Sequence, residues 1–423
     1  MTRKSWQRCD DCGHEIDELD RAERCPRCRG FLAIVHDVDR EGLRARLDAN
    51  RSTSGVWRFG ELILPTGVDV AVSHPEGNTP LLERAAVTRW AGAGRLLLKH
   101  EGHNPTGSFK DRGMTVGVTQ AKRIGARVVG CASTGNTSAS MASYAAHAGL
   151  AALVLVPDGQ VALGKLTQAL AYGARTLLIE GDFDRCLALM QEASETLGVY
   201  LLNSINPFRL EGQKTIVFEL LQQLGWTPPD WIALPAGNLG NTSAFGKAID
   251  EAYTLGLIDR KPRIAAIQAA GAAPFAHAFA RGFDELVPVH AETVASAIKI
   301  GAPASYRRAV HAIRSTNGVV ASVTDAEILA AKIEIDRAGV GCEPGSAASV
   351  AGVRQLRQNG TIGANESVVA VLTGHILKDT GILQKIHERS DAMMHGANPP
   401  VRVDATVAAI GEALDAMEDS NQD

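Results

Sequence analysis

The sequence lacks the features that mark several broad classes of protein. Its 43 lysines and arginines nearly balance its 47 aspartates and glutamates, so the net charge of −4 gives no general basic character that would favour nucleic acid. No apolar run approaches the roughly 20 residues of a membrane-spanning helix. The N-terminal residues also lack the apolar core of a secretory signal. We therefore expect neither a membrane nor a nucleic-acid partner.

Cysteine is sparse over most of the chain. Beyond residue 28 only Cys131, Cys186 and Cys342 occur, each in an apolar stretch, which is typical of core residues. The uneven placement of the seven cysteines predicts a reducing compartment, and we expect the cytoplasm. With 423 residues, the chain is long enough for two or three domains that each bury a full core.

The other four cysteines stand together at the front of the chain. They form two CxxC pairs separated by twelve residues: Cys9, Cys12, Cys25 and Cys28. Each pair can point two thiolates at one tetrahedral metal, and four thiolates complete a structural zinc site. His14 is a competing ligand, and the alternative is a ribbon that has lost its metal. Acids and bases are interleaved around these cysteines, so we interpret residues 1–36 as a structural or interaction module.

Apolar strand-like runs alternate with amphipathic helix-like segments after the ribbon. Strands that are apolar throughout predict a parallel sheet covered by helices on both faces. The number of strands favours two α/β sheets, one nested in the other: a small domain at 120–214 inside a large domain formed by 37–119 and 215–423. The expected strands include Leu96–Lys99, Val128–Thr134, Ala151–Asp158, Asp230–Gly237 and Glu366–His375.

The stretch HEGHNPTGSFKDRGM places a lysine at the start of a helix. Leu96–Lys99 ends like a buried strand, a turn follows, and Ser108 can cap a helix whose first turn holds Lys110. The positive end of the helix dipole and partial burial would lower the pKa of Lys110 and make its amine nucleophilic. The alternative for this residue alone is a solvated surface lysine.

Two polar loops follow predicted strands and lead into helices, where backbone N–H groups can bind anions. The loop STGNTS, from Ser133 to Ser138, could hold a carboxylate, although an ordinary helix cap has a similar composition. The loop AGNLGN, from Ala236 to Asn241, has glycines that let its backbone approach a phosphate monoester. It lacks the lysine and hydroxyl spacing of a nucleotide-triphosphate loop.

Two further segments carry polar groups in places where ligands collect. Thr373 ends the last strand and could direct its hydroxyl at a buried ring, or be an ordinary strand-end threonine. The segment NSINPFRLEGQK holds Arg209, whose fork suits a phosphate or carboxylate, unless it forms a salt bridge with Glu211. A lysine, a phosphate loop, a hydroxyl-rich loop and a ring-facing hydroxyl together suit pyridoxal phosphate.

The motifs HNPTGSFKDRGM, STGNTS, NSINPFRLEGQKT, PAGNLGN, CEPGSAAS and LTGHILKD occur in this order. With them the chain, from about Gly77 to Lys385, resembles the threonine synthases among the fold-type II pyridoxal-phosphate enzymes. That resemblance implies a two-domain α/β fold like the tryptophan synthase β subunit. An N-terminal zinc ribbon occurs on some such chains. Ile376 and Leu239 depart from residues that this family often has.

The resemblance implies roles for particular residues. Lys110 would hold the cofactor and shuttle protons, Asn136 would bond its 3′-oxygen and Thr373 would face its ring nitrogen. The cofactor phosphate would lie in a cradle formed by Gly237, Asn238, Leu239, Gly240 and Asn241. The substrate carboxylate or phosphate would be bound by Ser133, Thr137, Asn203, Ser204, Arg209 and Lys214.

The activity that the resemblance implies is the conversion of O-phospho-L-homoserine and water to L-threonine and phosphate, by a homodimer. Related type II enzymes are alternatives: a threonine or serine dehydratase, or a β-replacement enzyme similar to cysteate synthase. A catalytically silent binding protein that uses the ribbon as its contact surface is an alternative of another class, and the intact Lys110 argues against it.

Overall fold

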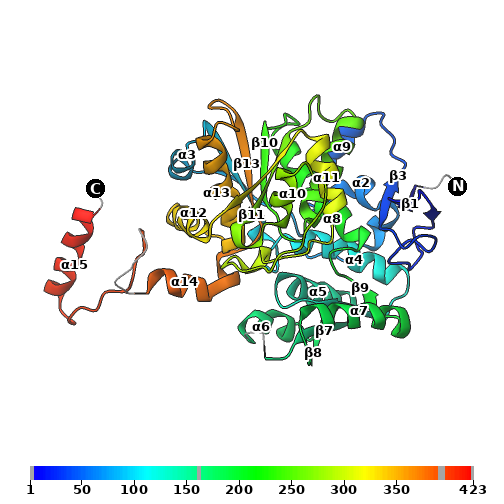
Figure 1. Ribbon diagram of the computed structural model, residues 1–423, viewed down its shortest axis with the longest axis horizontal. Helices are drawn as coiled ribbons and strands as arrows, with labels where there is room; N and C mark the ends of the chain where they lie inside the picture. The colour runs from blue at the N-terminus through cyan, green and yellow to red at the C-terminus, as the bar shows by residue number, and fades with distance from the viewer. Residues whose placement is uncertain (1–3, 160–162, 389–395, 421–423) are drawn as a thin grey trace. The chain divides into compact units, whose positions relative to one another are not determined.

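The computed structural model describes residues 4–159, 163–388 and 396–420. Met1–Asp379 and Thr380–Asp423 form two compact units. Three sheets belong to the first unit (Figure 1). The second unit contains α14 (Thr380–His387) and α15 (Val407–Ser420). Among the described residues, no helix combines the length and the apolar character needed to cross a bilayer.

The N-terminal sheet is a small antiparallel ribbon. Its strands are β1 (Ser5–Cys9), β2 (Glu15–Ile16) and β3 (Leu32–His36), in the order β2-β1-β3. A two-residue strand such as β2 buries little apolar surface, so the ribbon needs other support. After it come α1 (Leu43–Ala49), η1 (Trp57–Phe59), α2 (Gly60–Ile63) and η2 (Pro65–Val70).

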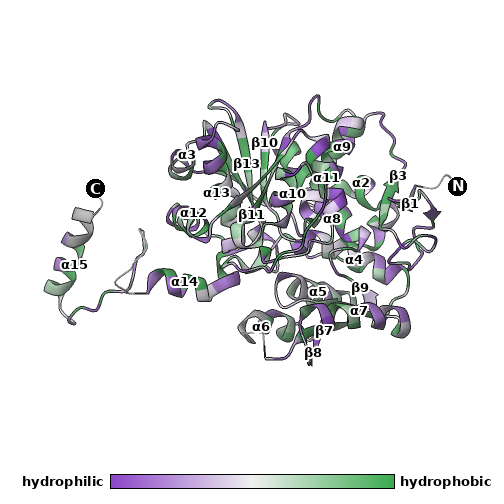
Figure 2. Ribbon diagram, viewed as in Figure 1, coloured by the Kyte–Doolittle hydropathy of each residue, from purple (hydrophilic) through white to green (hydrophobic). Residues whose placement is uncertain are grey.

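The largest sheet has six strands in the order β12-β11-β10-β13-β5-β4, all parallel except β4. The strands are β4 (Leu81–Glu83), β5 (Arg95–His100), β10 (Trp231–Pro235), β11 (Arg263–Ala269), β12 (Val319–Val323) and β13 (Ser367–Leu372). Every residue of β10 is buried. Figure 2 shows these central strands as mostly hydrophobic, as expected for a parallel sheet covered on both faces.

Helices cover both faces of this sheet. Alternate residues of β10 enter different cores: Ile232 and Leu234 belong to one cluster, and Trp231 and Ala233 to the other. The first cluster contains residues of α8 (Pro207–Gln223), α9 (Gly240–Thr254), α10 (Pro274–Ala280) and α11 (Tyr306–Ser315). The second contains residues of α3 (Ala85–Ala91), α12 (Asp325–Arg337) and α13 (Pro344–Gln358).

The third sheet is parallel and has the order β8-β7-β6-β9. Its strands are β6 (Val128–Ala132), β7 (Ala151–Pro157), β8 (Arg175–Ile179) and β9 (Tyr200–Leu201). Residues of α4 (Lys110–Arg123), α5 (Asn136–Ala148) and α6 (Leu163–Ala171) share one core with this sheet. Helix α7 (Phe183–Leu197) packs on the other face.

The expectation of two nested α/β sheets is confirmed, because the strands of the smaller sheet lie between those of the larger one in sequence. The sequence analysis named neither β4 nor β12. Helix α4 begins at Lys110, with Phe109 as its N-cap, so Ser108 is not the capping residue. Its hydroxyl accepts only a 3.4 Å hydrogen bond from the Lys110 N–H. The exact domain boundaries stay a prediction.

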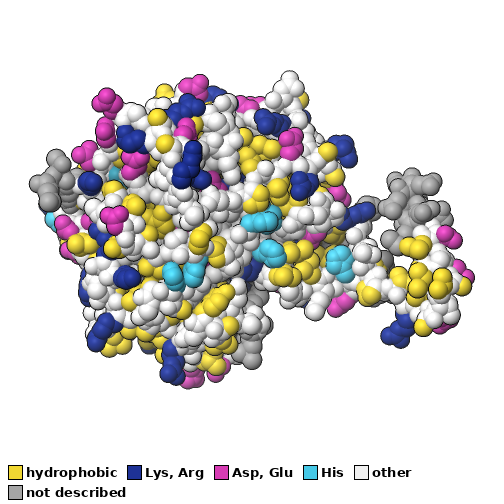
Figure 3. All heavy atoms as spheres, turned by 180° about the vertical axis from the view of Figure 1, so that it is seen from behind, with side chains coloured by type: hydrophobic (Ala, Val, Ile, Leu, Met, Phe, Trp, Pro, Cys, Tyr) yellow, Lys and Arg dark blue, Asp and Glu magenta, His cyan; other side chains and the backbone are white. Residues whose placement is uncertain are grey.

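Surface charge agrees with the balanced composition. On the face that Figure 3 displays, Lys and Arg side chains lie interspersed with Asp and Glu side chains. The charges of both signs are therefore mixed on that face.

Candidate active site

Lys110 follows a turn whose geometry is fixed by the next residue in the chain, Asp111. The turn between β5 and α4 includes Gly107 at φ 85°, a conformation that glycine adopts without strain. The carboxylate of Asp111 accepts hydrogen bonds from Thr106 N at 2.7 Å, from Thr106 Oγ1 at 2.6 Å and from Ser140 Oγ at 2.5 Å. The residue after the lysine therefore fastens both the turn and helix α5 to the start of α4.

The environment of Lys110 favours a neutral amine. Its side chain is partly buried, and its Nζ lies 4.2 Å from the centre of the Phe109 ring. Burial, and then the positive charge of Arg209, lower the pKa of Lys110 to about 7, while Glu343 acts in the opposite direction. The predicted lowering of this pKa agrees with the structure, although Arg209 was not among the predicted causes.

The end of β13 is joined to the lysine turn. Phe109 N donates to Thr373 O at 3.0 Å, and His375 N donates to Gly107 O at 2.9 Å. The Thr373 hydroxyl is buried and lies 3.0 Å from Ser346 Oγ. This pairing brings the predicted ring-facing hydroxyl and the predicted cofactor lysine to the same place from distant parts of the sequence.

Glu343, which was not predicted from the sequence, contacts two of the predicted site residues. Its carboxylate accepts hydrogen bonds from Asn136 Nδ2 at 3.0 Å and from Thr373 Oγ1 at 3.4 Å. Burial raises the pKa of Glu343, while the hydrogen bond from Asn136 opposes that shift. The sequence did hold a signal: an acidic residue at the N-cap of an apolar helix, directly before Pro344. Glu343 therefore links the side chain predicted to bind the 3′-oxygen of the cofactor to the side chain predicted to face its ring nitrogen.

The AGNLGN loop connects β10 to α9. Leu239 has φ 63°, so a left-handed residue precedes the first helical turn, and such a backbone nest turns N–H groups toward an anion. A Cβ added to Gly237 would lie 3.0 Å from Ile298 Cα, which shows how closely the loop packs. Asn238 is a structural residue of this loop, since its amide bonds Ser204 Oγ and Ala304 N, both at 2.6 Å.

Polar atoms without partners gather at the start of α9. Both amide atoms of Asn241 and the hydroxyl of Thr242 are buried and have no hydrogen-bond partner within the described ranges. The Gln213 Oε1, on α8, has none either. Buried polar groups are nearly always satisfied, so a cluster of exceptions at a helix N-terminus fits an anionic ligand. Thr242 was not predicted, although it directly follows the predicted loop.

Arg209 lies on α8 against α4. A Cβ added to Gly117 would lie 3.1 Å from Arg209 Cγ, so a small residue on α4 makes room for the arginine. Its Nη1 donates to Leu202 O at 2.9 Å, whereas Nε and Nη2 have no partner among the residues described. Burial lowers the pKa of Arg209 to about 10. The alternative of a salt bridge with Glu211 is wrong, because Glu211 pairs with Lys214, Lys247 and His36.

Lys214 is not brought to this group. Its ammonium donates to Glu251 Oε2 at 2.6 Å and to Leu62 O at 2.9 Å, and it pairs with Glu211 at 2.5 Å. Five residues along a helix turn the side chain by about 140° from Arg209, which explains its different direction. A role for Lys214 in binding substrate stays a prediction without support from these contacts.

The remaining predicted residues surround the strand ends of the smaller sheet. The Asn203 amide bonds the backbone of Ala132, accepting from N at 3.2 Å and donating to O at 3.5 Å. Ser133 Oγ accepts from Gly135 N at 3.4 Å, and Thr137 lies in the first turn of α5. Asn203 therefore holds the STGNTS loop in place, whereas Ser133 and Thr137 are partly exposed.

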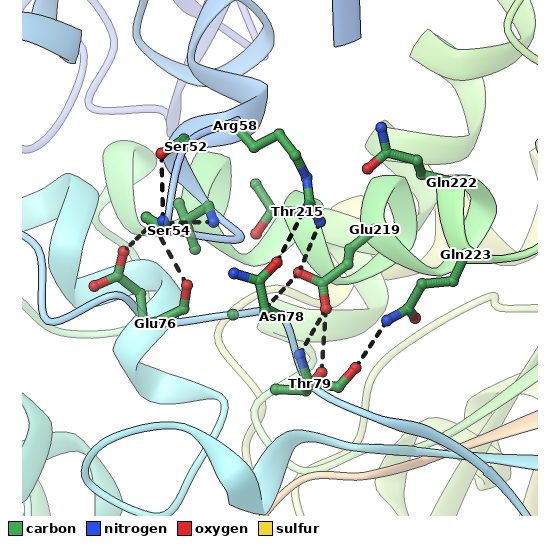
Figure 4. Close-up of polar contacts among 12 residues, drawn as sticks. Ser52, Ser54, Arg58, Glu76, Asn78, Thr79, Thr215, Glu219, Gln222 and Gln223 are labelled. Carbon is green, nitrogen blue, oxygen red and sulfur yellow. Dashed lines mark hydrogen bonds and ion pairs between the residues drawn. The ribbon is translucent and has the colours of Figure 1, made fainter. Parts of the chain in front are cut away.

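A second buried polar network lies next to this group. Figure 4 shows the Glu219 carboxylate with Arg58, Asn78 and Thr79 around it. Glu219 accepts from the backbone N–H groups of Asn78 at 2.8 Å and Thr79 at 2.9 Å, and from Lys99 Nζ at 2.6 Å. Arg112 joins this network from α4, donating to Glu219 Oε1 at 2.9 Å. Apart from Arg58 Nε, which has no partner among the described residues, these groups hydrogen-bond one another and join α4 to α8.

The four N-terminal cysteines converge as predicted. Their sulfurs all lie within 4.8 Å of one another, with 3.4 Å between Cys9 and Cys28 and 3.7 Å between Cys12 and Cys25. Four Zn–S bonds of about 2.3 Å in a tetrahedron separate the sulfurs by roughly 3.8 Å. The cluster therefore fits a four-thiolate metal site.

Comparisons with known proteins agree with this geometry. The family model described as "Pyridoxal-phosphate dependent enzyme" matches residues 72–374. The threonine synthase of Methanosarcina acetivorans is 44% identical over 414 residues, which cover 96% of this chain and 98% of that protein. The threonine synthase of Synechocystis is 50% identical over 72% of this chain and 78% of its own length.

Solved structures show the same fold at low sequence identity. Threonine synthase from Escherichia coli is 20% identical, with a TM-score of 0.71 over 97% of this chain and all of that chain. The processed threonine deaminase isoform 2 from Solanum lycopersicum is 21% identical, with a TM-score of 0.65 over 79% of this chain and 94% of its own. Since a threonine synthase and a threonine deaminase share the fold, the substrate depends on particular side chains.

Proposed function

We propose that this chain, which belongs to the pyridoxal-phosphate-dependent enzyme family and within it to the threonine synthases, divides its reaction between a cofactor half and a substrate half of one site. The reaction converts O-phospho-L-homoserine and water to L-threonine and phosphate. The cofactor is pyridoxal phosphate, which supplies an electron sink for carbanion chemistry when it is bound.

The cofactor half consists of Lys110, Asn136, Thr373 and the start of α9. The unpartnered amide of Asn241 and hydroxyl of Thr242 support a phosphate in the loop from Gly237 to Asn241. Lys110 would hold the cofactor through its amine, Asn136 would bond the 3′-oxygen and Thr373 would face the ring nitrogen. A threonine at that position donates or accepts a hydrogen bond without adding a charge.

Lys110 also has the properties of a proton carrier. With a pKa of about 7, its ammonium and amine forms are both populated near neutral pH. A group in that range can take a proton from carbon and return it at the neighbouring carbon without a large thermodynamic penalty. Glu343 orients Asn136 and Thr373 by accepting a hydrogen bond from each, so we assign it a positioning role.

The substrate half is centred on Arg209. Asn203 and Ser204 precede it at the start of the same segment, and Ser133 and Thr137 offer hydroxyls for the substrate carboxylate. The single observation that carries this assignment is a buried guanidinium, close enough to Lys110 to lower its pKa, with two nitrogens that find no partner in the part of the chain that the structure describes. A buried, unpaired cation of this kind is stabilised by a phosphate monoester.

The decisive experiment is a comparison of substrates on the purified protein. We expect release of inorganic phosphate and formation of threonine from O-phospho-L-homoserine. Parallel reactions with O-phosphoserine plus sulfite, and with threonine alone, test the β-replacement and dehydratase alternatives. Formation of 2-oxobutanoate from threonine, with no turnover of phosphohomoserine, would refute the proposed substrate. A wild-type protein with no visible cofactor absorbance would instead favour a silent binding protein.

We further propose zinc as the metal of the four-cysteine cluster, the cytoplasm as the location, and a homodimer as the working form. The convergence of the four sulfurs supports the metal, and the seven free cysteines support a reducing compartment. The dimer rests on family resemblance alone. Elemental analysis should find about one zinc per chain, and light scattering should give about twice the mass of the 44.8 kDa chain.

A further inference from the structure

The first cysteine pair of the ribbon is fixed to a helix of the six-stranded sheet. Asp10, between Cys9 and Cys12, accepts from Arg308 Nε at 2.5 Å, and Asp11 accepts from Arg307 Nη1 at 2.9 Å. Both arginines belong to α11, which packs on α9 and β11. The first CxxC turn is therefore attached to the larger sheet.

The second cysteine pair is fixed to a helix of the four-stranded sheet. Ser194 donates to the carboxylate of Glu23, and Arg29 Nη2 donates to Glu195 Oε1 at 2.8 Å. Ser194 and Glu195 lie on α7, which packs on β6, β7 and β9. The two CxxC turns of the ribbon therefore contact helices that pack on different sheets.

Phe31 adds an apolar contact to this arrangement. It packs against the cluster that contains Cys186 and Met190 of α7. The Cζ of Arg24 lies 3.9 Å from the centre of the Phe31 ring, and that of Arg308 lies 5.1 Å from it. The ring is thus in contact with the core of the smaller sheet while an arginine of the larger sheet lies near it.

The last strand of the ribbon also reaches the helix that carries Arg209. His36 Nε2 lies 2.7 Å from Glu211 Oε2, and both side chains are buried. Lys247 donates to Ile34 O at 2.5 Å and pairs with Glu211 as well. Glu211 is two residues beyond Arg209 on α8, so the ribbon contacts the helical turn that carries Arg209.

The four cysteine sulfurs lie together, so one metal ion could join the turn that contacts α11 to the turn that contacts α7. Cys9 and Cys12 belong to the turn on α11, and Cys25 and Cys28 belong to the turn beside α7. We propose that the ribbon is a tether: a metal held by all four cysteines joins the smaller sheet to the larger one and limits movement of α7 relative to α8. This inference goes beyond the proposed reaction and does not depend on its substrate.

Amide hydrogen exchange on the full-length protein without substrate tests the tether. Stripping the metal with a chelator, or the variant Cys12→Ser/Cys28→Ser, should raise exchange about tenfold in residues 183–201, since the links through Glu23, Arg29 and Phe31 lose their common anchor. Residues 231–235 and 367–372, in the core of the larger sheet, should keep their exchange rates. Unchanged exchange in 183–201, or an equal rise throughout the chain, would overturn the proposal.

A second variant separates the proposed restraint on α7 from unfolding of the ribbon itself. Phe31→Ala leaves all four cysteines in place and removes the contact with the α7 core, so it should raise exchange in 183–201 with the metal content unchanged. Arg27→Ala, at an exposed position in the second CxxC turn, is the matched control and should change neither the exchange in 183–201 nor the metal content. If Phe31→Ala behaves like Arg27→Ala, the ribbon does not restrain α7.

Discussion

Helix α4 carries two cations two residues apart, and their surroundings are opposite in kind. Arg112 is buried and donates to Glu101 Oε2 at 2.6 Å, to Glu219 Oε1 at 2.9 Å and to Thr215 Oγ1 at 3.2 Å. Burial alone would lower the pKa of Arg112, but the charges of Glu101 and Glu219 raise it above its usual value. Lys110 is partly buried, and its charged neighbour Arg209 is also positive.

The same contrast holds along α8. Glu219, toward the end of the helix, accepts hydrogen bonds from backbone and side chains on several elements, and the charges of Arg112 and Lys99 outweigh burial to hold its pKa below the usual range. Arg209, near the start, has two donors without partners in the described chain. Burial therefore does not separate the structural from the functional charges. Between Glu219 and Arg209 the difference is unmet hydrogen-bonding capacity, because a folded chain rarely leaves a buried charge unpaired unless a ligand completes it.

The largest effect should come from Lys110→Ala. We expect turnover to fall by at least about 10²–10⁴-fold, since the group that carries protons is gone, and the visible absorbance of the bound cofactor to vanish. In cofactor-free protein the free energy of unfolding should change little, because among the described residues the Lys110 side chain takes part in no structural hydrogen-bond network. Lys122→Ala, at an exposed position on the same helix, is the control. A Lys110→Ala protein that still turns over would contradict the assignment.

Glu219→Gln should have the opposite signature. Removing this carboxylate leaves Lys99 and Arg112 short of a counter-charge, which should lower the free energy of unfolding by about 3–5 kcal/mol. Urea denaturation measures the loss. Glu292→Gln, which breaks an ion pair between exposed groups, should cost no more than about 1 kcal/mol. If both variants lose the same amount, the Glu219 network does not anchor the helices.

Arg209→Met should make the fold more stable and the enzyme inactive. Relief of two unsatisfied buried donors should raise the free energy of unfolding by about 1–3 kcal/mol, since methionine fills similar space without a charge. Thermal stabilisation by inorganic phosphate, which we expect for the wild type, should be lost. Arg209→Lys should keep part of it. If Arg209→Met is instead less stable than the wild type, Arg209 has a structural role like that of Arg112.

The smallest perturbation is a change of pH. In cofactor-free protein, Lys110 is an ammonium below its pKa and a reactive amine above it, so its acylation rate should rise with a midpoint at about pH 7. Lys99 is fully buried and donates to Glu219, Gln223 and Thr79 O, so it should stay unlabelled over the same range. Mass spectrometry of labelled peptides follows both residues. A Lys110 midpoint near its ordinary value of 10.5 would contradict the pKa shift.

Much of the architecture could be predicted because it depends on local pattern. Continuous apolar runs identified β6, β7, β10 and β13, and the CxxC spacing identified the four-cysteine cluster. Strand β12 was missed because its sequence, VVASV, is short and its burial is only partial. Ser108 was assigned as a helix cap from its residue type, but the N-cap is the next residue, Phe109, and the helix starts at Lys110.

The site was predicted only in part. Lys110, Asn136 and the glycine loop were predicted because each follows a strand and opens a helix, a position that can be identified from the sequence. Glu343 and Thr242 were missed, since an acid before proline and a threonine inside a helix have common structural explanations. Lys214 was grouped with Arg209 because they are close in sequence, whereas a helix directs them to different sides.

The sequence by itself determined which residues could carry chemistry: a lysine at a helix start, a glycine loop before a helix and a four-cysteine ribbon, because residue type and spacing are local properties. The tertiary structure decided which of them work together. It brought Thr373 beside the lysine turn, left Arg209 unpaired while Lys214 was paired, and linked both cysteine turns to different sheets. The pairing of a charge depends on contacts between distant segments, which no local pattern specifies.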